Sequence, residues 1–106
     1  NALLRRELDE AAVRQANRIV ADSVEQARVE AGDLFPLIER GHLMWGQVHE
    51  LGDVVIGHVP GRGSATEITL FKSLGLAVED IAAAAVVYQR AKADGAGETI
   101  AMFGDL

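Results

Sequence analysis

Residues 67–88 read EITLFKSLGLAVEDIAAAAVVY and join three patterns without a spacer. The segment Ile68 to Phe71 has the β-branched and aromatic composition of a strand. A polar tip follows at Lys72 and Ser73, and a long apolar helix begins a few residues later. Open α/β sheets bind their ligands at the carboxyl ends of their strands. The stretch is therefore typical of the active-site edge of an α/β protein.

The helix in this stretch is specified at both ends. Glu79 and Asp80 suit a first turn, and Arg90 and Lys92 suit a last turn, because these charges complement the helix dipole. Residues 81–88 are apolar on every side of the helix. We therefore expect this long C-terminal apolar helix to be buried between layers of the chain or between this chain and another.

An upstream segment predicts a second strand between two helices. Residues 18–22 read RIVAD, a short apolar strand, and Asp9 is placed to cap a helix that runs to about Ala16. Ser23 with Gln26 forms a capping-box pattern that begins another helix. Because parallel strands need a crossover helix, the alternation predicts an α/β fold in which both strands lie parallel in one sheet.

The middle of the chain is less regular. We expect Gly32 to end the preceding helix in a left-handed conformation, and a brief helix to follow over residues 33–40. Residues 45–56 carry apolar side chains at a helical spacing and predict a further helix. Residues 60–64 read PGRGS, a loop, and residues 99–103 suggest a last strand.

Composition excludes several classes of function. The 106 residues are 49% hydrophobic and carry a net charge of −6, which disfavours nucleic acid and anionic membrane surfaces as partners. No apolar run approaches the roughly 20 residues that span a bilayer. The chain has no cysteine, so it has neither a disulfide framework nor a thiolate metal site, and we expect a cytoplasmic location.

Three segments together carry a family resemblance. Residues 67–88, with the sequences RELD at 6–9 and ADSVEQA at 21–27, resemble the later part of the ornithine cyclodeaminase/mu-crystallin family of nicotinamide-dependent enzymes and binding proteins. The resemblance covers nearly the whole chain. It implies a partial Rossmann-like parallel sheet with flanking helices, in which residues 73–106 return toward the substrate and dimerisation domain.

The resemblance also implies what the chain does. The chain is expected to be a C-terminal fragment of an NAD(P)-binding domain, because the glycine-rich turn that binds the pyrophosphate is expected upstream. The whole protein would use NAD or NADP to act on a small amino acid or cyclic imine, as a homodimer or a higher homo-oligomer. The fragment alone is expected to be inactive.

Four residues are candidates for the site by resemblance. Asn1 stands where the family has an acid/base aspartate, and an amide cannot take that proton at neutral pH. Arg5 replaces a family lysine and, with Lys72 and Ser73, is a candidate cofactor-binding residue. Ser73 is expected near the nicotinamide, with Thr69 and Lys72 supporting its turn. An alternative is that Ser73 only caps the helix that follows.

Other residues are weaker candidates. Residues 61–64, with Arg62, resemble a phosphate cradle, but no strand leads into them and a turn is the better interpretation. The three histidines lack the spacing of a zinc motif, so we expect no metal site. Trp45 and Phe71 are expected to be packing anchors.

Two functions remain open on the sequence. The first is part of an NAD(P)-dependent enzyme of this family. The second is a non-catalytic, mu-crystallin-like binding or oligomerisation module, in which Asn1 marks lost chemistry and residues 81–88 serve as an interface.

Overall fold

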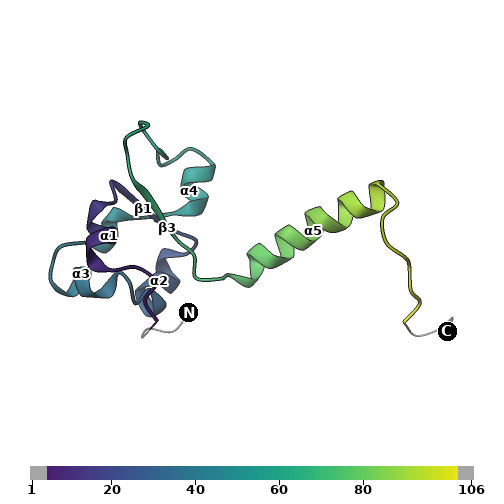
Figure 1. The fold of residues 1–106 in the computed structure, drawn as a ribbon, viewed down its shortest axis with the longest axis horizontal. Helices are drawn as coiled ribbons and strands as arrows, with labels where there is room; N and C mark the ends of the chain where they lie inside the picture. Colours follow the sequence, from purple (N-terminus) through teal and green to yellow (C-terminus); the bar gives the residue numbers. More distant parts are fainter. Residues whose placement is uncertain (1–4, 103–106) are drawn as a thin grey trace. The chain divides into compact units, whose positions relative to one another are not determined.

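The computed structural model describes residues 5–102, which form two compact units that meet between Gly75 and Leu76. The first unit contains the elements α1 (Glu10–Gln15), β1 (Arg18–Ala21), α2 (Val24–Glu30), α3 (Phe35–Glu39), a 3₁₀ turn (Trp45–Gln47), β2 (Val48–Glu50), α4 (Leu51–Val55) and β3 (Thr69–Lys72) (Figure 1). The second unit contains α5 (Ala77–Ala93).

The three strands form one parallel sheet in the order β2-β1-β3. Val20, in the central strand, lies opposite His49 of β2 and Phe71 of β3. The helices between the strands supply the crossovers that parallel pairing requires. The predicted α/β class is confirmed, and so is the parallel pairing of the two strands expected at residues 18–22 and 68–71.

One face of the sheet carries the core of the first unit. Ile19 and Ala21 of β1 and Val48 of β2 are buried there, and α1, α2 and α3 add buried side chains to the same cluster. Fully burying each large apolar side chain contributes about 1.5–3 kcal/mol. Ile19, Val20 and Ala21 of the central strand are all buried, so this strand is covered on both faces. The helical members of the cluster include Val13, Ala27 and Leu37.

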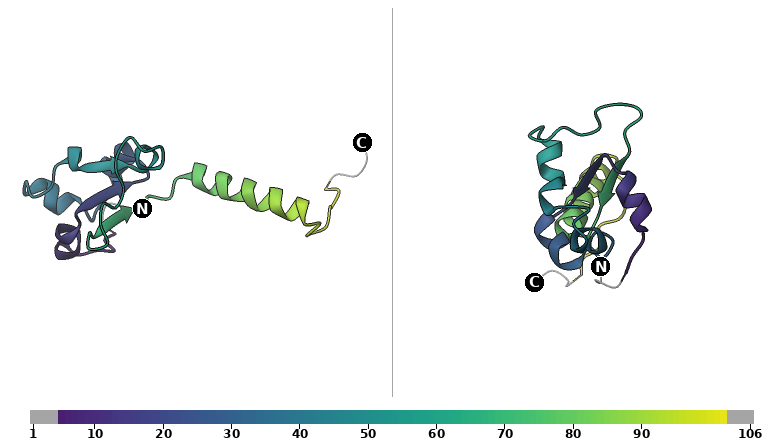
Figure 2. Two further views of the ribbon diagram at one scale, coloured as in Figure 1. Left: turned by 90° about the horizontal axis from the view of Figure 1, so that it is seen from above. Right: turned by 90° about the vertical axis from the view of Figure 1, so that its left-hand side faces the viewer.

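The opposite face of the sheet is covered by α4. Val20 points away from the core face, because successive side chains of a strand alternate. Leu51 and Val54 of α4 lie beside Val20 and Phe71 around a small hollow of about 170 Å³. The views in Figure 2 show α1 and α4 on opposite sides of the strands. Helices thus flank the sheet on both faces, as predicted.

The predicted helix starts are confirmed, and one predicted stop is wrong. Asp9 Oδ1 accepts a hydrogen bond from the Ala12 amide at 2.8 Å, and Ser23 Oγ accepts one from the Gln26 amide at 3.2 Å. The second helix ends at Glu30 with Ala31 as its C-cap, and Gly32 is not left-handed. A left-handed glycine instead follows the third helix, at Gly41.

The helix predicted over residues 45–56 is also wrong. This segment forms the 3₁₀ turn, β2 and the short α4. Val48 is buried and pairs with Ile19, so its side chain joins the core from a strand and not from a helix. Gly46 and Gly52 weaken any continuous helix here. The apolar spacing that suggested one helix is shared between two elements with different partners.

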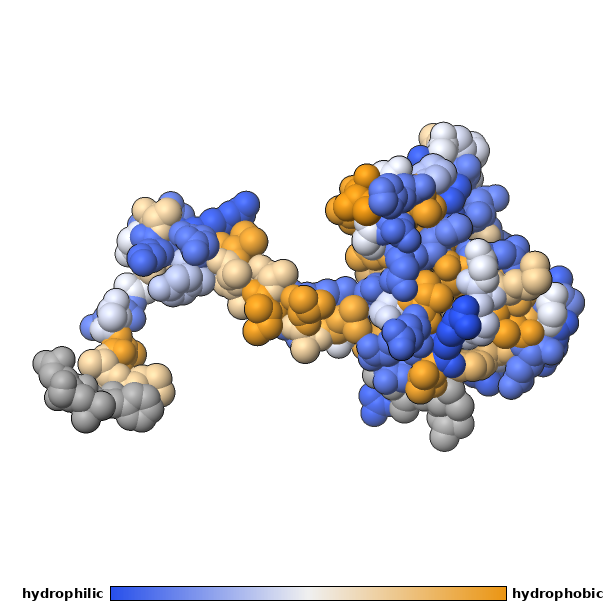
Figure 3. Space-filling view, turned by 180° about the vertical axis from the view of Figure 1, so that it is seen from behind, coloured by the Kyte–Doolittle hydropathy of each residue, from blue (hydrophilic) through white to orange (hydrophobic). Residues whose placement is uncertain are grey.

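The second unit consists of α5 and the residues after it. The predicted helix is confirmed, and left-handed Gly95 follows it. In the part of the chain that the structure describes, no residue of α5 is buried, and Ile81 is 71% exposed. Hydrophobic residues cover the first turns of α5 in Figure 3, and hydrophilic residues surround its last turns. Within its own unit, α5 has no covering layer among the described residues.

The last predicted strand is not formed within the described residues. Residues 99–102 have no strand partner, and Ile100 is 77% exposed. Two neighbouring apolar residues alone do not place a segment in a sheet, because a strand needs an edge to pair with. Among residues 5–102, no helix is long and apolar enough to cross a membrane.

Candidate functional site

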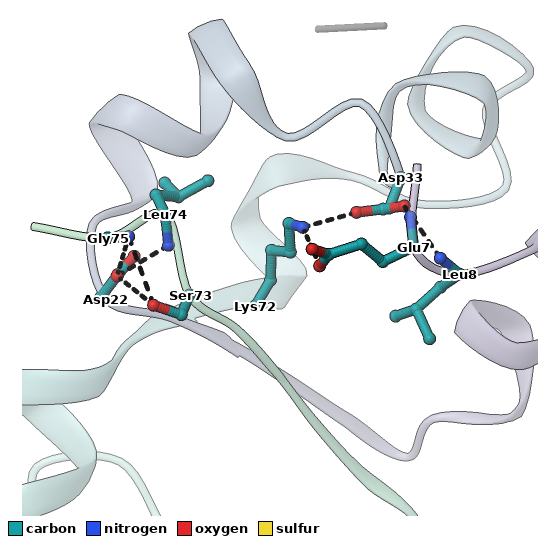
Figure 4. A network of polar contacts seen from close by, with 8 residues as sticks. All are labelled: Glu7, Leu8, Asp22, Asp33, Lys72, Ser73, Leu74 and Gly75. Atoms are coloured by element: carbon teal, nitrogen blue, oxygen red, sulfur yellow. Dashed lines mark hydrogen bonds and ion pairs between the residues drawn. The ribbon is translucent and has the colours of Figure 1, made fainter. Parts of the chain in front are cut away.

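The candidate site lies where the central strand and β3 end. Ala21 pairs with Lys72, so the residues that follow them, Asp22 and Ser73, lie side by side at the carboxyl edge of the sheet. Figure 4 shows the polar network that forms there. This is the edge at which open α/β sheets bind ligands, as the sequence predicts.

Asp22 shapes the turn after β3. Its Oδ2 accepts hydrogen bonds from the Leu74 amide at 2.8 Å, the Ser73 hydroxyl at 3.1 Å and the Gly75 amide at 3.3 Å. Gly75 has a φ of 77°, a left-handed conformation that glycine adopts without the steric cost of a side chain. One carboxylate oxygen therefore holds three consecutive residues in a fixed turn.

Ser73 does not cap the following helix. The residue that caps α5 is Leu76, and no side chain accepts from the amides of its first turn. The Ser73 hydroxyl donates to Asp22 and accepts from the Gly75 amide at 3.3 Å. The capping alternative is therefore wrong, and the hydroxyl belongs to the turn at the edge of the sheet.

Lys72 lies beneath this turn between two carboxylates. Its Nζ is 2.7 Å from Asp33 Oδ2 and 3.0 Å from Glu7 Oε2, and the side chains of Lys72 and Asp33 are 5% and 0% exposed. The Glu7 side chain, by contrast, is 71% exposed. The ammonium is thus committed to this pair of acids, which favours a supporting role over direct contact with a ligand.

The other oxygen of Asp33 holds the N-terminal segment of the described chain. Oδ1 accepts from the Glu7 amide at 2.6 Å and from the Leu8 amide at 3.1 Å. Burial by itself would raise the pKa of the Asp33 carboxyl, but the hydrogen bond from Lys72 and the two amides outweigh it, so the pKa lies below its usual range.

The pKa of Lys72 is perturbed in the matching direction. Burial alone would lower the pKa of its ammonium, but hydrogen bonds to Asp33 and then to Glu7 raise it above its usual range. Both groups are therefore charged at neutral pH, and the pair is fully formed.

An open cleft of about 710 Å³ lies beside the network. Residues 70–75 form one wall, and Glu7 with Leu8 forms the other. The cleft combines apolar side chains with the polar turn, a mixture typical of a site for a small organic ligand. Phe71 is 49% exposed and lines this cleft, so its predicted role as a packing anchor is wrong.

The remaining sequence candidates lie elsewhere. Arg5 is exposed, and Asn1 lies outside the described residues. Arg62 donates to the Glu67 carbonyl and, at 2.7 Å, to Thr69 Oγ1, so its own loop holds it. Trp45 is a packing anchor as predicted: it contacts the ring of Phe35 edge-on at 5.9 Å and packs against the core.

Metal-ligating side chains do not gather in the described chain. Over residues 5–102, no group of three or more His, Asp or Glu side chains is placed to hold a metal ion. His58 lies 3.7 Å from Asp53, on the surface and away from the cleft.

Three acids at the site were missed by the sequence reasoning. Asp22 is the last residue of the strand predicted at residues 18–22, and a polar residue at the end of a strand was a usable signal for the ligand edge. Asp33 lies between Ala31 and Leu34, which are both fully buried, but the sequence does not show that its partner is 39 positions away. Glu7 belongs to the RELD segment that carries the family resemblance, but nothing in the sequence assigned it a role at the site.

Comparisons with known proteins agree with this geometry. The sequence profile of the ornithine cyclodeaminase/mu-crystallin family matches residues 2–95. A Delta(1)-pyrroline-2-carboxylate reductase of Bacillus cereus is 43% identical over 95 residues, which cover 89% of this chain and 29% of that protein.

Two solved structures share the fold. The Delta(1)-pyrroline-2-carboxylate reductase of Thermococcus litoralis, in complex with NADH and L-proline, is 38% identical with a TM-score of 0.74, over 92% of this chain and 30% of that one. An archaeal alanine dehydrogenase dimer with bound NAD is 37% identical with a TM-score of 0.66, over 93% of this chain and 31% of that one.

The present chain spans about three tenths of the length of these relatives. The matched region includes all three strands, the turn between β3 and α5, and the whole of α5. The sheet is a partial Rossmann-like sheet, as predicted. The chain belongs to the ornithine cyclodeaminase/mu-crystallin family.

Proposed function

We propose that this chain supplies one wall of an NAD(P)-dependent oxidoreductase site that acts on a small amino acid or cyclic imine. The observation that carries the proposal is the turn Ser73–Gly75, which Asp22 holds at the carboxyl edge of the sheet beside an open cleft. Family membership and the NADH and L-proline named for the Thermococcus litoralis relative support it.

The lining of the cleft fits the nicotinamide end of such a cofactor. Leu8 and Leu70 are half-buried and offer apolar surface to a ring, and the Ser73 turn offers polar groups to its amide. The pyrophosphate end does not fit here, because Asp22 occupies the backbone amides of the turn and two carboxylates neutralise Lys72. When bound, the nicotinamide supplies or accepts the hydride.

The residues of this chain would then position the ligand without moving the proton. Asp22 keeps the Ser73 hydroxyl oriented, and the apolar side chains of the cleft would pack against the ring. By resemblance, Asn1 occupies the position of the family's acid/base, and an amide cannot act as one. We therefore propose that the reaction is changed, or that the proton comes from another group, and that Arg5 and Lys72 contribute to the cofactor site only indirectly.

The second candidate is a non-catalytic binding or oligomerisation module of the same family. Asn1 favours it, and so does the exposure of α5, where Val87 is 67% and Tyr88 is 62% exposed. We propose that residues 73–106 lead toward the substrate and dimerisation domain and that the protein is a homodimer. The dimer named for the archaeal alanine dehydrogenase supports this assembly. A cytoplasmic location stays a prediction.

A ligand titration tests the proposed site on this chain. Nicotinamide mononucleotide, added at millimolar concentration, is expected to shift the NMR signals of the amides at 73–75, 7 and 8, and adenosine diphosphate is expected to leave them unchanged. Ser73→Ala should weaken the response. Equal shifts from both ligands, or none from the mononucleotide, would contradict the proposed site.

Calorimetry with NADH and NADPH supplies the companion measurement. We expect weak binding, because the chain offers no pyrophosphate site in this cleft. Micromolar affinity corresponds to about 8 kcal/mol and would require a dinucleotide site that the described residues do not form.

A further inference from the structure

Asp33 joins the two walls of the cleft through its two carboxylate oxygens. Oδ1 accepts the amides of Glu7 and Leu8, which form one wall. Oδ2 is 2.7 Å from Lys72, which is the last residue of β3 and belongs to the other wall. Figure 4 shows Lys72 and the Glu7–Leu8 backbone approaching Asp33 from different sides. The two walls are about 65 residues apart in the sequence, and this one side chain holds both.

This arrangement differs from the usual use of an aspartate before a helix. Asp33 lies one residue before Leu34, the N-cap of α3, and an acidic side chain at the N-cap commonly caps the first turn. No side chain caps α3, although the acid is close. The carboxylate instead bonds to residues 25 and 26 positions earlier and 39 positions later. Its contacts are long-range and converge on the cleft.

A structural role alone does not account for a charged pair at this place. Asp33 is 2% exposed and is surrounded in sequence by buried apolar residues such as Ala31 and Leu34. Replacing a buried ion pair with apolar side chains is often neutral or stabilising, so such a pair is weak support for stability. Its hydrogen bonds are directional, however, and they fix where each partner lies.

We propose that Asp33 is a positioning residue that sets the separation between the Glu7–Leu8 wall and the β3 wall of the ligand cleft. The inference rests on the proposed function for its meaning, since the cleft is the proposed nicotinamide site. The link between the two walls is itself observed in the contacts of Asp33 Oδ1 and Oδ2. Glu7 adds a third link, because its carboxylate reaches Lys72 directly at 3.0 Å.

Two matched double variants test the proposal. Asp33→Asn with Lys72→Met removes the ion pair but keeps an oxygen that accepts the two amides. Asp33→Ala with Lys72→Met removes the ion pair and the acceptor together. Both variants leave no unpaired buried charge, so they differ in the hydrogen bonds to the N-terminal wall and in one small cavity.

The readout is amide hydrogen exchange in the absence of ligand. The Asn variant is expected to keep the protection of the Glu7 and Leu8 amides within about threefold of the parent. The Ala variant should lose at least tenfold while the Val20 amide, in the central strand, keeps its protection. General loosening of the core would also speed exchange at Val20, and Asp33→Asn would not restore protection at Glu7 and Leu8 alone. Equal exchange at Glu7 and Leu8 in the two variants would overturn the proposal.

A second pair of variants covers the case in which the Ala variant does not fold. Glu7→Ala removes only the exposed carboxylate, whereas Glu7→Pro also removes the amide that donates to Asp33 at 2.6 Å. We expect faster exchange at the Leu8 amide in the Pro variant than in the Ala variant. Equal rates would count against the tether. The titration with nicotinamide mononucleotide is an independent test. If the Glu7 and Leu8 amides show the expected protection but the mononucleotide shifts no signals, Asp33 remains a positioning residue and the nicotinamide site is rejected.

Discussion

Lys72→Met is expected to destabilise the first unit by about 3 kcal/mol at pH 7. The variant keeps the volume of the side chain but leaves Asp33 buried without its cation. Breaking a buried ion pair by removing one partner costs about 3–5 kcal/mol. The lower end applies because Asp33 Oδ1 keeps its two amide donors, and only Oδ2 loses its partner at 2.7 Å. A loss of this size is a large part of the usual 5–15 kcal/mol of a domain.

The loss is expected to depend on pH. Without Lys72, only the amides of Glu7 and Leu8 oppose the effect of burial, so the pKa of Asp33 should be higher in the variant than in the parent. Protonation then relieves the buried charge, so the difference between variant and parent should shrink from pH 7 to pH 4.

In the parent protein, by contrast, the contribution of the ion pair to stability should decrease at acidic pH. The pKa of Asp33 is lowered on folding, so its contribution is present above about pH 3.9 and is lost as the pH falls through the folded value. The pKa of Lys72 is raised, so its contribution is present below about pH 10.4 and is lost at higher pH. The pair therefore stabilises the fold across the whole neutral range.

Urea unfolding followed by the fluorescence of Trp45 measures the difference. Trp45 is the sole tryptophan of the chain and packs against the core of the first unit. Lys92→Met is the matched control, because Lys92 lies on α5 over the ring of Tyr88 and not in the core, and it should change stability by less than about 0.5 kcal/mol. A Lys72→Met variant as stable as the parent, or a loss that does not change with pH, would refute the reasoning.

Two further predictions concern the turn and α5. Asp22→Ala should lower the free energy of unfolding by about 1–3 kcal/mol and speed hydrogen exchange at the Leu74 and Gly75 amides. Asp22→Asn keeps an acceptor and should preserve much of the protection. Unchanged exchange in the Ala variant would show that the turn forms without Asp22. The chain should self-associate at tens of micromolar in sedimentation experiments, because covering each large apolar side chain on α5 contributes about 1.5–3 kcal/mol. Val87→Asp should shift the protein toward the monomer, and Gln89→Asp should not. A monomeric parent would reject the interface.

The local sequence was sufficient for much of the fold. The strands at residues 18–22 and 68–71 were predictable because β-branched and apolar residues are bounded by polar turns. The caps at Asp9 and Ser23 were predictable because capping depends on neighbours only three residues away. Such signals are complete within a short window, so a single sequence contains them.

The rest depended on partners that are distant in the sequence. Val48 belongs to a strand because Ile19, about 30 residues earlier, offers an edge for pairing, and the local spacing alone suggested a helix. The role of Lys72 was uncertain for the same reason. Its position at the end of β3 was predictable, but its burial against Asp33 was not, because the sequence does not show which acid a lysine will meet.

The strand order has a consequence for synthesis on the ribosome. The central strand β1 is made first, and β2 can pair with one of its edges once residue 50 has emerged. Its other edge waits for β3, which ends at Lys72. The interval of about 20 residues corresponds to roughly 1–4 s of translation. During that time a strand rich in apolar residues presents an unpaired edge, which is the kind of surface on which nascent chains associate wrongly and chaperones act.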